Sequence, residues 1–268
     1  MTTGSSAGES DSRTAGSRPR TVGVIPARLA SSRFPEKVLA AETGKPLVVH
    51  VLEQARKAKS LDAIVVAADH PRIVAAVEAA GGIAVLTRED HPNGTSRLSE
   101  VATKVQADVF VNIQGDEPEI EPEIIDAAVE LLHASPWADV ATVATPFAAG
   151  EDPRDPNLVK VVLGLGGRAL YFSRAPIPLH RDAAKAELTG TAPRATPLRH
   201  VGLYVYRTSF LPTFVSWPPS ALEETESLEQ LRVLEHGHGI AVAVRRVTSQ
   251  GIDTPEQYAA FVDRMRKR

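Results

Sequence analysis

The chain has 268 residues, of which 43% are hydrophobic, enough to bury a core in one domain or in one domain with a sizeable lobe. Its net charge of −3 gives no general basic field for nucleic acid, and the absence of cysteine excludes disulfides, thiol catalysis and thiolate metal sites. No apolar run approaches the ~20 residues that span a bilayer. We therefore expect a cytoplasmic protein without a membrane segment, in which any anion site is local.

The first twenty residues are rich in Ser, Gly, Thr and Arg and lack the apolar stretch of a signal peptide. Such a composition cannot bury enough apolar surface to fold, so residues 1–20 are predicted to be a disordered tail. Residues 21–268 are expected to form a single domain.

The first predicted element is a short β-branched run, Thr21–Ile25, which is typical of a buried parallel strand. It leads into a polar loop that carries Arg28, Ser31, Ser32 and Lys37. In open α/β sheets, ligands bind at the carboxyl ends of the strands, so this loop is a candidate anion site. An ordinary surface loop is the alternative interpretation.

The segment that follows alternates between strand-like and helix-like patterns. This βαβαβ alternation predicts an α/β fold with a doubly wound, mostly parallel sheet of the Rossmann-like kind. The expected helices start near residues 47, 71, 96 and 122, and the expected strands span 62–68, 83–86, 108–113 and 140–145.

The pattern changes at about residues 147–219, where short strand-like runs are separated by Gly and Pro turns. The runs at 159–163, 169–172 and 202–207 predict an antiparallel β lobe inserted into the α/β domain. After the lobe we expect one long helix capped by Ser220 and Glu223, then a late strand and a final helix that begins at Thr254.

Two carboxylates are predicted to face the cationic loop. Asp116 follows a Gly turn at a strand end, and Asp253 lies at a strand-to-helix junction. Two carboxylates beside a triphosphate would repel it unless Mg²⁺ stood between them, and Mg²⁺ prefers oxygen ligands. A turn residue and a helix-start residue are the simpler interpretations. The chain has no Gly-x-Gly-x-x-Gly after a strand and no Walker loop, which argues against a dehydrogenase and a P-loop kinase.

Six motifs occur in order along the chain: VIPARLASSRFPEK at 24–37, QGDEP at 114–118, YFSRAPIP at 171–178, RHVGLY at 199–204, LEQLR at 228–232 and GIDTPE at 251–256. Together they resemble one enzyme family, the 3-deoxy-manno-octulosonate cytidylyltransferases, or CMP-Kdo synthetases. The resemblance runs from about Thr21 to the C-terminus.

The resemblance implies a reaction in which CTP and 3-deoxy-D-manno-octulosonate (Kdo) give CMP-Kdo and pyrophosphate, activating the sugar for lipopolysaccharide synthesis. It implies an Mg²⁺-dependent nucleotidyltransferase that is a homodimer through its lobe. The net charge and the lack of a long apolar run add the expectation that the protein binds neither nucleic acid nor membrane. The implied catalytic residues are Arg28, Lys37, Asp116 and Asp253, the last two also holding the metal. The implied CTP-binding residues are Ala27, Arg28, Ser31, Ser32, Lys37, Asp69, Gly94, Thr95, Arg97 and Gln114. The implied sugar-binding residues are Arg174, His200, Tyr204, Glu229 and Gln230.

Several positions keep two interpretations. Arg33 either helps to bind phosphate or pairs with a carboxylate elsewhere. Asp69 either binds nucleotide or only caps its helix, since Ala68 precedes it where the family usually has Thr. Arg97 either binds the base or lies on a solvated helix face. Glu36 stands where the family often has Gly, and it either weakens the phosphate contact or points to solvent.

Two other functions are also compatible with the sequence. One is the same chemistry on another acidic sugar, an amino-Kdo analogue or a sialic acid, because the segment 182–197 has no firm counterpart in the family. The other is a non-catalytic CTP-binding sensor, against which the retention of two metal-type carboxylates argues.

Overall fold

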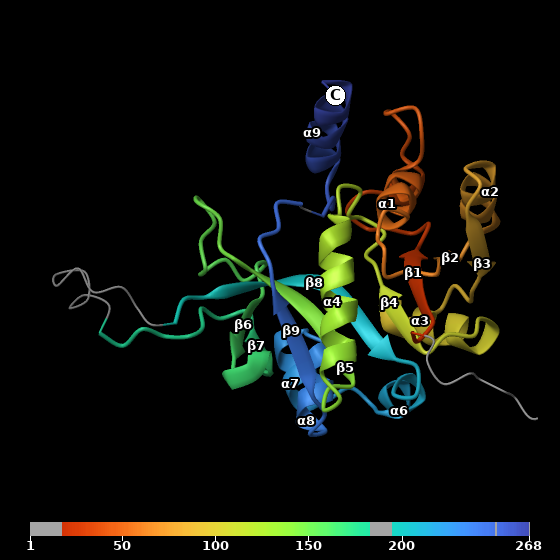
Figure 1. Cartoon of the computed structure of the whole chain (residues 1–268). Helices are drawn as coiled ribbons and strands as arrows, with labels where there is room; N and C mark the ends of the chain where they lie inside the picture. Colours follow the sequence, from red (N-terminus) through yellow and green to blue (C-terminus); the bar gives the residue numbers. More distant parts are fainter. Residues whose placement is uncertain (1–17, 183–194, 250, 268) are drawn as a thin grey trace, which may run out of the picture.

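The computed structural model describes residues 18–182, 195–249 and 251–267. Most of the predicted tail and most of the segment 182–197 therefore lie outside the described residues. The described strands form one sheet in the order β3-β2-β1-β4-β8-β5-β9, with β6 attached to β8 and β7 to β6 (Figure 1). Their bounds are β1 Thr21–Ala27, β2 Ala63–Ala68, β3 Ile83–Leu86, β4 Val109–Asn112, β5 Val140–Pro146, β6 Lys160–Leu163, β7 Ala169–Ser173, β8 Leu198–Arg207 and β9 Ile240–Val244.

The sheet is mostly parallel, which confirms the predicted fold class. β1 lies between β2 and β4 and pairs with both in parallel, and β5 pairs with β9 in parallel. Among the described strands, β8 runs against its neighbours β4, β5 and β6, and β7 runs against β6, while the other strands all run in one direction. The β-branched run of β1 suits this central place because the strand is buried on both faces.

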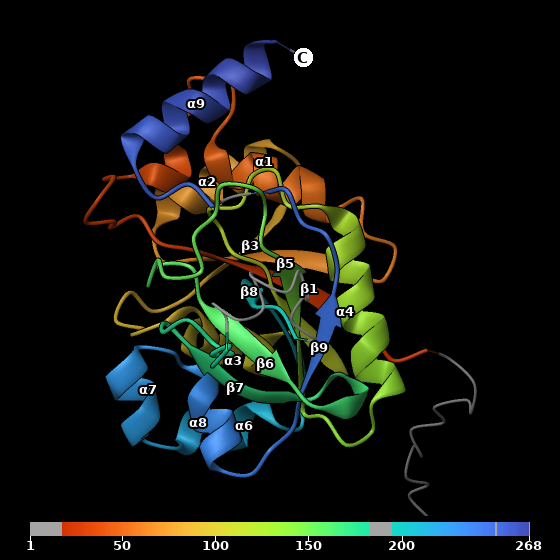
Figure 2. The same ribbon diagram turned by 90° about the vertical axis from the view of Figure 1, so that its left-hand side faces the viewer.

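Helices cover both faces of the sheet (Figures 1 and 2). One core joins α1, α2 and α4 to the sheet, and the other joins α3, α6 and α8 to it. In the described part of the chain, none of the helices has the length and apolar character needed to cross a membrane. The helix bounds are η1 Lys37–Leu39, α1 Leu47–Ala55, α2 Pro71–Ala79, α3 Gly94–Lys104, α4 Pro122–Ala134, η2 Leu165–Gly167, α6 Leu211–Ser216, α7 Ala221–Glu226, α8 Gln230–Glu235 and α9 Pro255–Arg266.

A small third core attaches the C-terminal helix α9 to the loop after β1. Phe34 of the loop packs against Tyr258 of α9, with ring centroids 5.4 Å apart, and the Tyr258 hydroxyl accepts a hydrogen bond from the Glu42 backbone N–H at 2.9 Å. Thr254 and Gln257 form the predicted capping box at the start of α9. This core brings the segment before α9 to the loop.

The structure differs from the expected elements in three places. The single long helix predicted after Ser220 is wrong: α7 and α8 are separate, because Ser227 between them adopts a left-handed conformation with φ 50°. The run at 202–207 was expected in the inserted lobe, but β8 lies inside the main sheet, hydrogen-bonded to both β4 and β5. Helix α3 begins at Gly94 rather than near Ser96, because Asn93 caps it by accepting from the Ser96 N–H.

Candidate functional site

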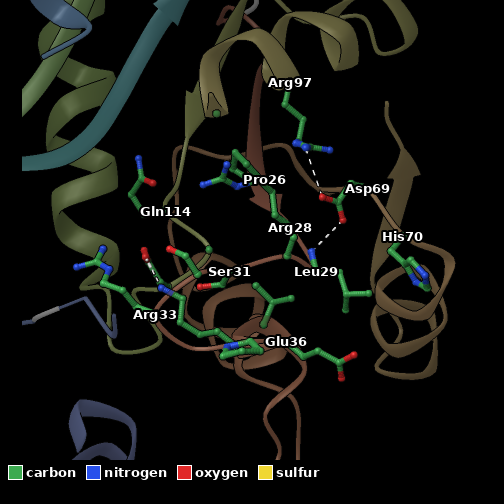
Figure 3. A pocket seen from close by; sticks show the side chains of 18 of the residues that line it. Pro26, Arg28, Leu29, Ser31, Arg33, Glu36, Asp69, His70, Arg97 and Gln114 are labelled. Carbon is green, nitrogen blue, oxygen red and sulfur yellow. Dashed lines mark hydrogen bonds and ion pairs between the residues drawn. The ribbon is translucent and has the colours of Figure 1, made fainter. Parts of the chain in front are cut away.

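A pocket of about 1040 Å³ opens at the carboxyl ends of β1, β2 and β4 (Figure 3). Its lining comes from the loop after β1, the junction of β2 and α2, the start of α3, the turn after β4 and the segment before α9. These segments contribute Arg28, Ser31, Ser32, Arg33, Lys37, Asp69, Gly94, Arg97, Gln114, Asp116 and Asp253, among others. Loops from neighbouring parallel strands thus converge, as is usual for ligand sites in open α/β sheets.

Lys37 bridges the carboxylates of Asp116 and Asp253, which come from distant parts of the sequence. Its Nζ donates to Asp116 Oδ2 at 2.9 Å, to Asp253 Oδ1 at 3.2 Å and to the Ile252 carbonyl at 2.5 Å. Arg33 lies 3.1 Å from the other oxygen of Asp253, so the carboxylate interpretation of Arg33 is the one observed. The ammonium shields two carboxylates that would otherwise repel each other.

The backbone around these carboxylates is tightly constrained. A Cβ at Gly115 would lie 2.4 Å from the Pro26 carbonyl oxygen, so only glycine fits where this turn crosses β1. The Ile252 N–H donates to the Asp116 carbonyl at 2.8 Å, which ties the segment before α9 to the same turn. These contacts hold Asp116 and Asp253 on one side of the pocket.

Arg97 provides unpaired donors at the other end of the pocket. The side chain is 1% exposed, and NH1 donates to Thr87 Oγ1 at 2.7 Å and to the Arg88 carbonyl at 3.0 Å. Its Nε and NH2 have no hydrogen-bond partner in the described structure, although NH2 lies 3.5 Å from Asp69 Oδ2. The solvated-face interpretation of Arg97 is therefore wrong, and a buried guanidinium with free donors favours a ligand with acceptor groups.

Asp69 does not cap α2. That role belongs to His70, whose ring accepts from the Arg72 N–H at 3.1 Å. Asp69 Oδ1 instead accepts from the Leu29 N–H at 2.9 Å (Figure 3). The Asp69 carboxylate therefore ties the loop after β1 to the end of β2 and faces the Arg97 guanidinium.

The remaining residues expected to bind nucleotide fall into two groups. Arg28, Ser31 and Ser32 line the pocket, and no hydrogen bond or ion pair engages their side chains within the described ranges. Ala27 is the buried last residue of β1, and Thr95 is buried in α3, where its hydroxyl donates to Glu229 at 3.1 Å; neither lines the pocket.

Gln114 and Gly94 both line the pocket. Gln114 Nε2 donates to the Gly202 carbonyl of β8 at 2.8 Å and so connects the pocket with the sheet region that carries His200 and Tyr204.

None of the residues expected to bind the sugar lines this pocket. The Arg174 guanidinium donates to the backbone carbonyls of Glu226, Pro156 and Ser227 at 2.6, 2.9 and 3.2 Å, so a sugar carboxylate would have to compete for these donors. Gln230 is 5% exposed and its Nε2 has no partner among the described residues.

The other expected sugar residues are on β8 and at the start of α8. His200 Nε2 lies 2.8 Å from Thr142 Oγ1 and its ring 5.3 Å from that of Tyr204; burial, aided by Arg199, lowers the pKa of His200 to about 3 and keeps it neutral. Burial raises the pKa of Glu229 to about 6, against the hydrogen bond from Thr95 and the charge of Arg232.

Sequence reasoning missed Glu117. Burial and the neighbouring Asp116 raise the pKa of its carboxyl to about 7, and Arg199 opposes the shift. Its place beside Asp116 in the QGDEP run was the available signal, but the burial that contributes most to the pKa shift arises only in the fold.

Asp116 and Asp253 suit a divalent ion that shares its coordination with a ligand. Both are oxygen donors that already converge on one cation, and their side chains are 32% and 44% exposed. Within residues 18–182, 195–249 and 251–267, no group of three or more His, Cys, Asp or Glu gathers to hold an ion unaided. Mg²⁺ would accordingly take its other ligands from phosphate oxygens and water.

Comparison with known proteins gives consistent results. Residues 22–241 match the family model described as cytidylyltransferase. The chain is 50% identical over 246 residues to a 3-deoxy-manno-octulosonate cytidylyltransferase of Syntrophobacter fumaroxidans, covering 91% of this chain and 96% of the relative. It is 48% identical over 251 residues to the enzyme of the same name from Yersinia enterocolitica, with the same coverage.

Solved structures agree with these sequence matches. The structure of CMP:2-keto-3-deoxy-manno-octonic acid synthetase complexed with CTP superposes with a TM-score of 0.85 at 41% identity, covering 92% of this chain and 99% of that one. A cytidylyltransferase from Leptospira borgpetersenii shares the fold alone, with a TM-score of 0.60 at 15% identity over 94% of this chain and 88% of that one.

Proposed function

The chain belongs to the cytidylyltransferase family, and we propose that it transfers CMP from CTP to Kdo, releasing pyrophosphate. The anomeric hydroxyl oxygen of the sugar attacks the α-phosphorus of CTP, and the bond from that phosphorus to the β-phosphate oxygen breaks. The hydroxyl proton passes to solvent, and pyrophosphate leaves with the bonding electrons. The observation that carries the proposal is the pocket, in which a cationic loop faces Asp116 and Asp253.

The chain's own residues contribute positioning and charge more than covalent chemistry, as phosphoryl transfer generally requires. Arg28 and the Ser31 and Ser32 hydroxyls are free to bind phosphate oxygens at the pocket mouth. Lys37 sits between the carboxylates and neutralises charge as pyrophosphate leaves. At the opposite end, the free donors of Arg97 suit the O2 and N3 acceptors of cytosine.

Mg²⁺ is part of the proposal, with Asp116 and Asp253 as its protein ligands. When bound, it would lower the pKa of the attacking hydroxyl and screen the phosphate charges. A homodimer is proposed on the family resemblance, and a cytoplasmic location on the lack of cysteine, which fits a reducing compartment.

The test is pyrophosphate release by the full chain with each of the four nucleoside triphosphates and with Kdo, an 8-amino Kdo analogue or N-acetylneuraminate. We expect release with CTP and Kdo only, and its loss on addition of EDTA. Release with another sugar in place of Kdo would reassign the acceptor, and CTP binding without release under any condition would identify a sensor. Activity that survives EDTA would refute the metal part alone.

A further inference from the structure

Glu36 has an uncommon backbone conformation for a residue with a side chain. Its φ is 55° and its ψ is 21°, in the left-handed region that glycine adopts freely and other residues adopt with strain. Within the described ranges, Ser227 is the only other residue besides glycine with positive φ. The strained position immediately precedes Lys37 and starts the turn η1.

The side chains of Glu36 and Lys37 leave this turn in different directions. Lys37 is buried and reaches the two carboxylates of the pocket. The Glu36 carboxylate lies at the pocket rim and points away from Arg33 (Figure 3). The left-handed turn is thus the backbone feature that allows the lysine to point inward while its neighbour points outward.

Arg72, the second residue of α2, holds the outward side chain. Its NH1 and NH2 donate to the two oxygens of Glu36 at 2.5 and 2.8 Å. This bidentate arrangement fixes orientation as well as distance. The Arg72 hydrogen bond also lowers the pKa of the Glu36 carboxyl, in keeping with a charged pair.

The junction of β2 and α2 therefore holds both ends of the loop that lines the pocket. Asp69 accepts from the Leu29 N–H at the start of the loop, and Arg72 holds Glu36 at its end. We propose that Glu36 and Arg72 are positioning residues: their ion pair maintains the left-handed turn that directs Lys37 into the pocket, and it thereby sets the affinity for CTP. This inference rests on the proposed function.

The first test compares two exposed ion pairs by calorimetric CTP binding and by CTP KM. Arg72→Ala should raise the Kd of CTP about threefold to tenfold, because the left-handed turn loses the ion pair that offsets its backbone strain. The control is Glu53→Ala, which breaks the exposed ion pair between Glu53 of α1 and Lys45 just before that helix, and which should leave the Kd of CTP unchanged. Equal, negligible effects of both substitutions would reduce the Glu36–Arg72 pair to an ordinary surface contact and overturn the inference.

The second test separates backbone strain from charge at position 36. Glu36→Ala and Glu36→Gly remove the same carboxylate, but only glycine adopts the left-handed turn without strain. We expect the alanine variant to bind CTP as weakly as Arg72→Ala, and the glycine variant to stay within about twofold of the unmodified chain. Adding Arg72→Ala to the Glu36→Gly variant should not change the Kd of CTP further.

If the carboxylate acted only by repelling phosphate, both substitutions would tighten CTP binding equally, and that result would overturn the inference. An unmodified chain that binds no CTP would instead overturn the proposed function. An unmodified chain that binds CTP, with all variants alike, would overturn this inference alone.

Discussion

The residues around the pocket (the nucleotide side) and the residues expected to bind the sugar (the sugar side) differ in how far their polar groups already have protein partners. Around the pocket, Arg28 and two nitrogens of Arg97 have no hydrogen-bond partner in the described structure, and the two carboxylates share a lysine. On the sugar side, Arg174 and His200 are engaged with other protein groups, and none of the residues expected to bind sugar lines the pocket. The first region is arranged for a ligand, whereas the second is satisfied largely by the protein itself.

This difference has a structural cause. The pocket is formed by short loops that leave adjacent parallel strands, so its residues meet because of the sheet order. The residues expected to bind the sugar come from the end of the β6–β7 hairpin, from β8 and from the broken helix α7–α8. Hydrogen bonds at Glu226 tie the hairpin to the broken helix, and the β6–β8 ladder ties it to β8. Around the expected sugar site, polar side chains such as Arg174 stabilise the fold through hydrogen bonds to other protein groups.

The largest expected effect is at the carboxylates of the pocket. Asp116→Asn and Asp253→Asn should each lower kcat by about a hundredfold or more, because the charge that would hold Mg²⁺ and pair with Lys37 is halved. Pyrophosphate release across an Mg²⁺ series measures this, and the Mg²⁺ requirement should move to higher concentration. Asp263→Asn, an exposed position on α9, is the control. Full activity of the Asp253→Asn variant would show that the segment before α9 takes no part in the reaction.

Arg97→Lys should raise the KM of CTP about tenfold and reduce the preference for CTP over UTP, since an ammonium cannot present the same forked donors. Its melting temperature should also be recorded, because Arg97 has protein partners as well. Arg88→Lys is the matched control, as that side chain is 68% exposed and paired with Asp90. An unchanged preference for CTP over UTP would show that Arg97 does not contact the base.

Arg174→Ala tests the sugar side. It should raise the KM of the sugar about fivefold with little change in that of CTP, and it should also lower the free energy of unfolding by about 1–3 kcal/mol because three carbonyls lose their donor. The two KM values and a urea titration measure these effects. Equal changes in both KM values would move Arg174 out of the sugar region.

The smallest expected effect is a pH dependence of stability. Since burial raises the pKa of Glu229 above its ordinary 4.5 to about 6, the folded state binds this proton more tightly than the unfolded state. The associated stability, at most about 2 kcal/mol, is fully present below pH ~4.5 and is lost as pH rises through ~6. Urea unfolding of Glu229→Gln should lack this decline, whereas the exposed Glu224→Gln should keep it; identical curves for all three proteins would contradict the burial argument.

The sequence predicts the nucleotide half better than the rest. The run Thr21–Ile25 and the later alternation of strands and helices are local patterns, and they indicate the parallel sheet correctly. The position of Asp116 follows from its place just after β4. Asp253 lies well beyond the end of β9 at Val244, and contacts of the segment before α9 with Asp116 and Lys37 bring it to the pocket. The placement of β8 inside the sheet does not follow, because a strand-like run contains no information about its neighbours.

Details that depend on tertiary contacts could not be predicted from the sequence either. Glu36 was hard to interpret from sequence because both its left-handed φ and its partner Arg72 appear only in the fold. The break at Ser227 is similar: a continuous helical pattern predicts one helix, and the hydrogen bonds that Glu226 receives from Ser173 and Arg174 favour a turn there.

If this pocket joins CMP to Kdo, the reaction must convert the phosphates of CTP into a phosphodiester and pyrophosphate. The most direct measurement follows the phosphorus resonances of CTP while the unmodified chain is incubated with Kdo and Mg²⁺. We expect the CTP signals to be replaced by one phosphodiester resonance of a sugar nucleotide and by an equal amount of pyrophosphate. CTP that stays intact with Kdo, or that is converted only to free CMP, would contradict this expectation.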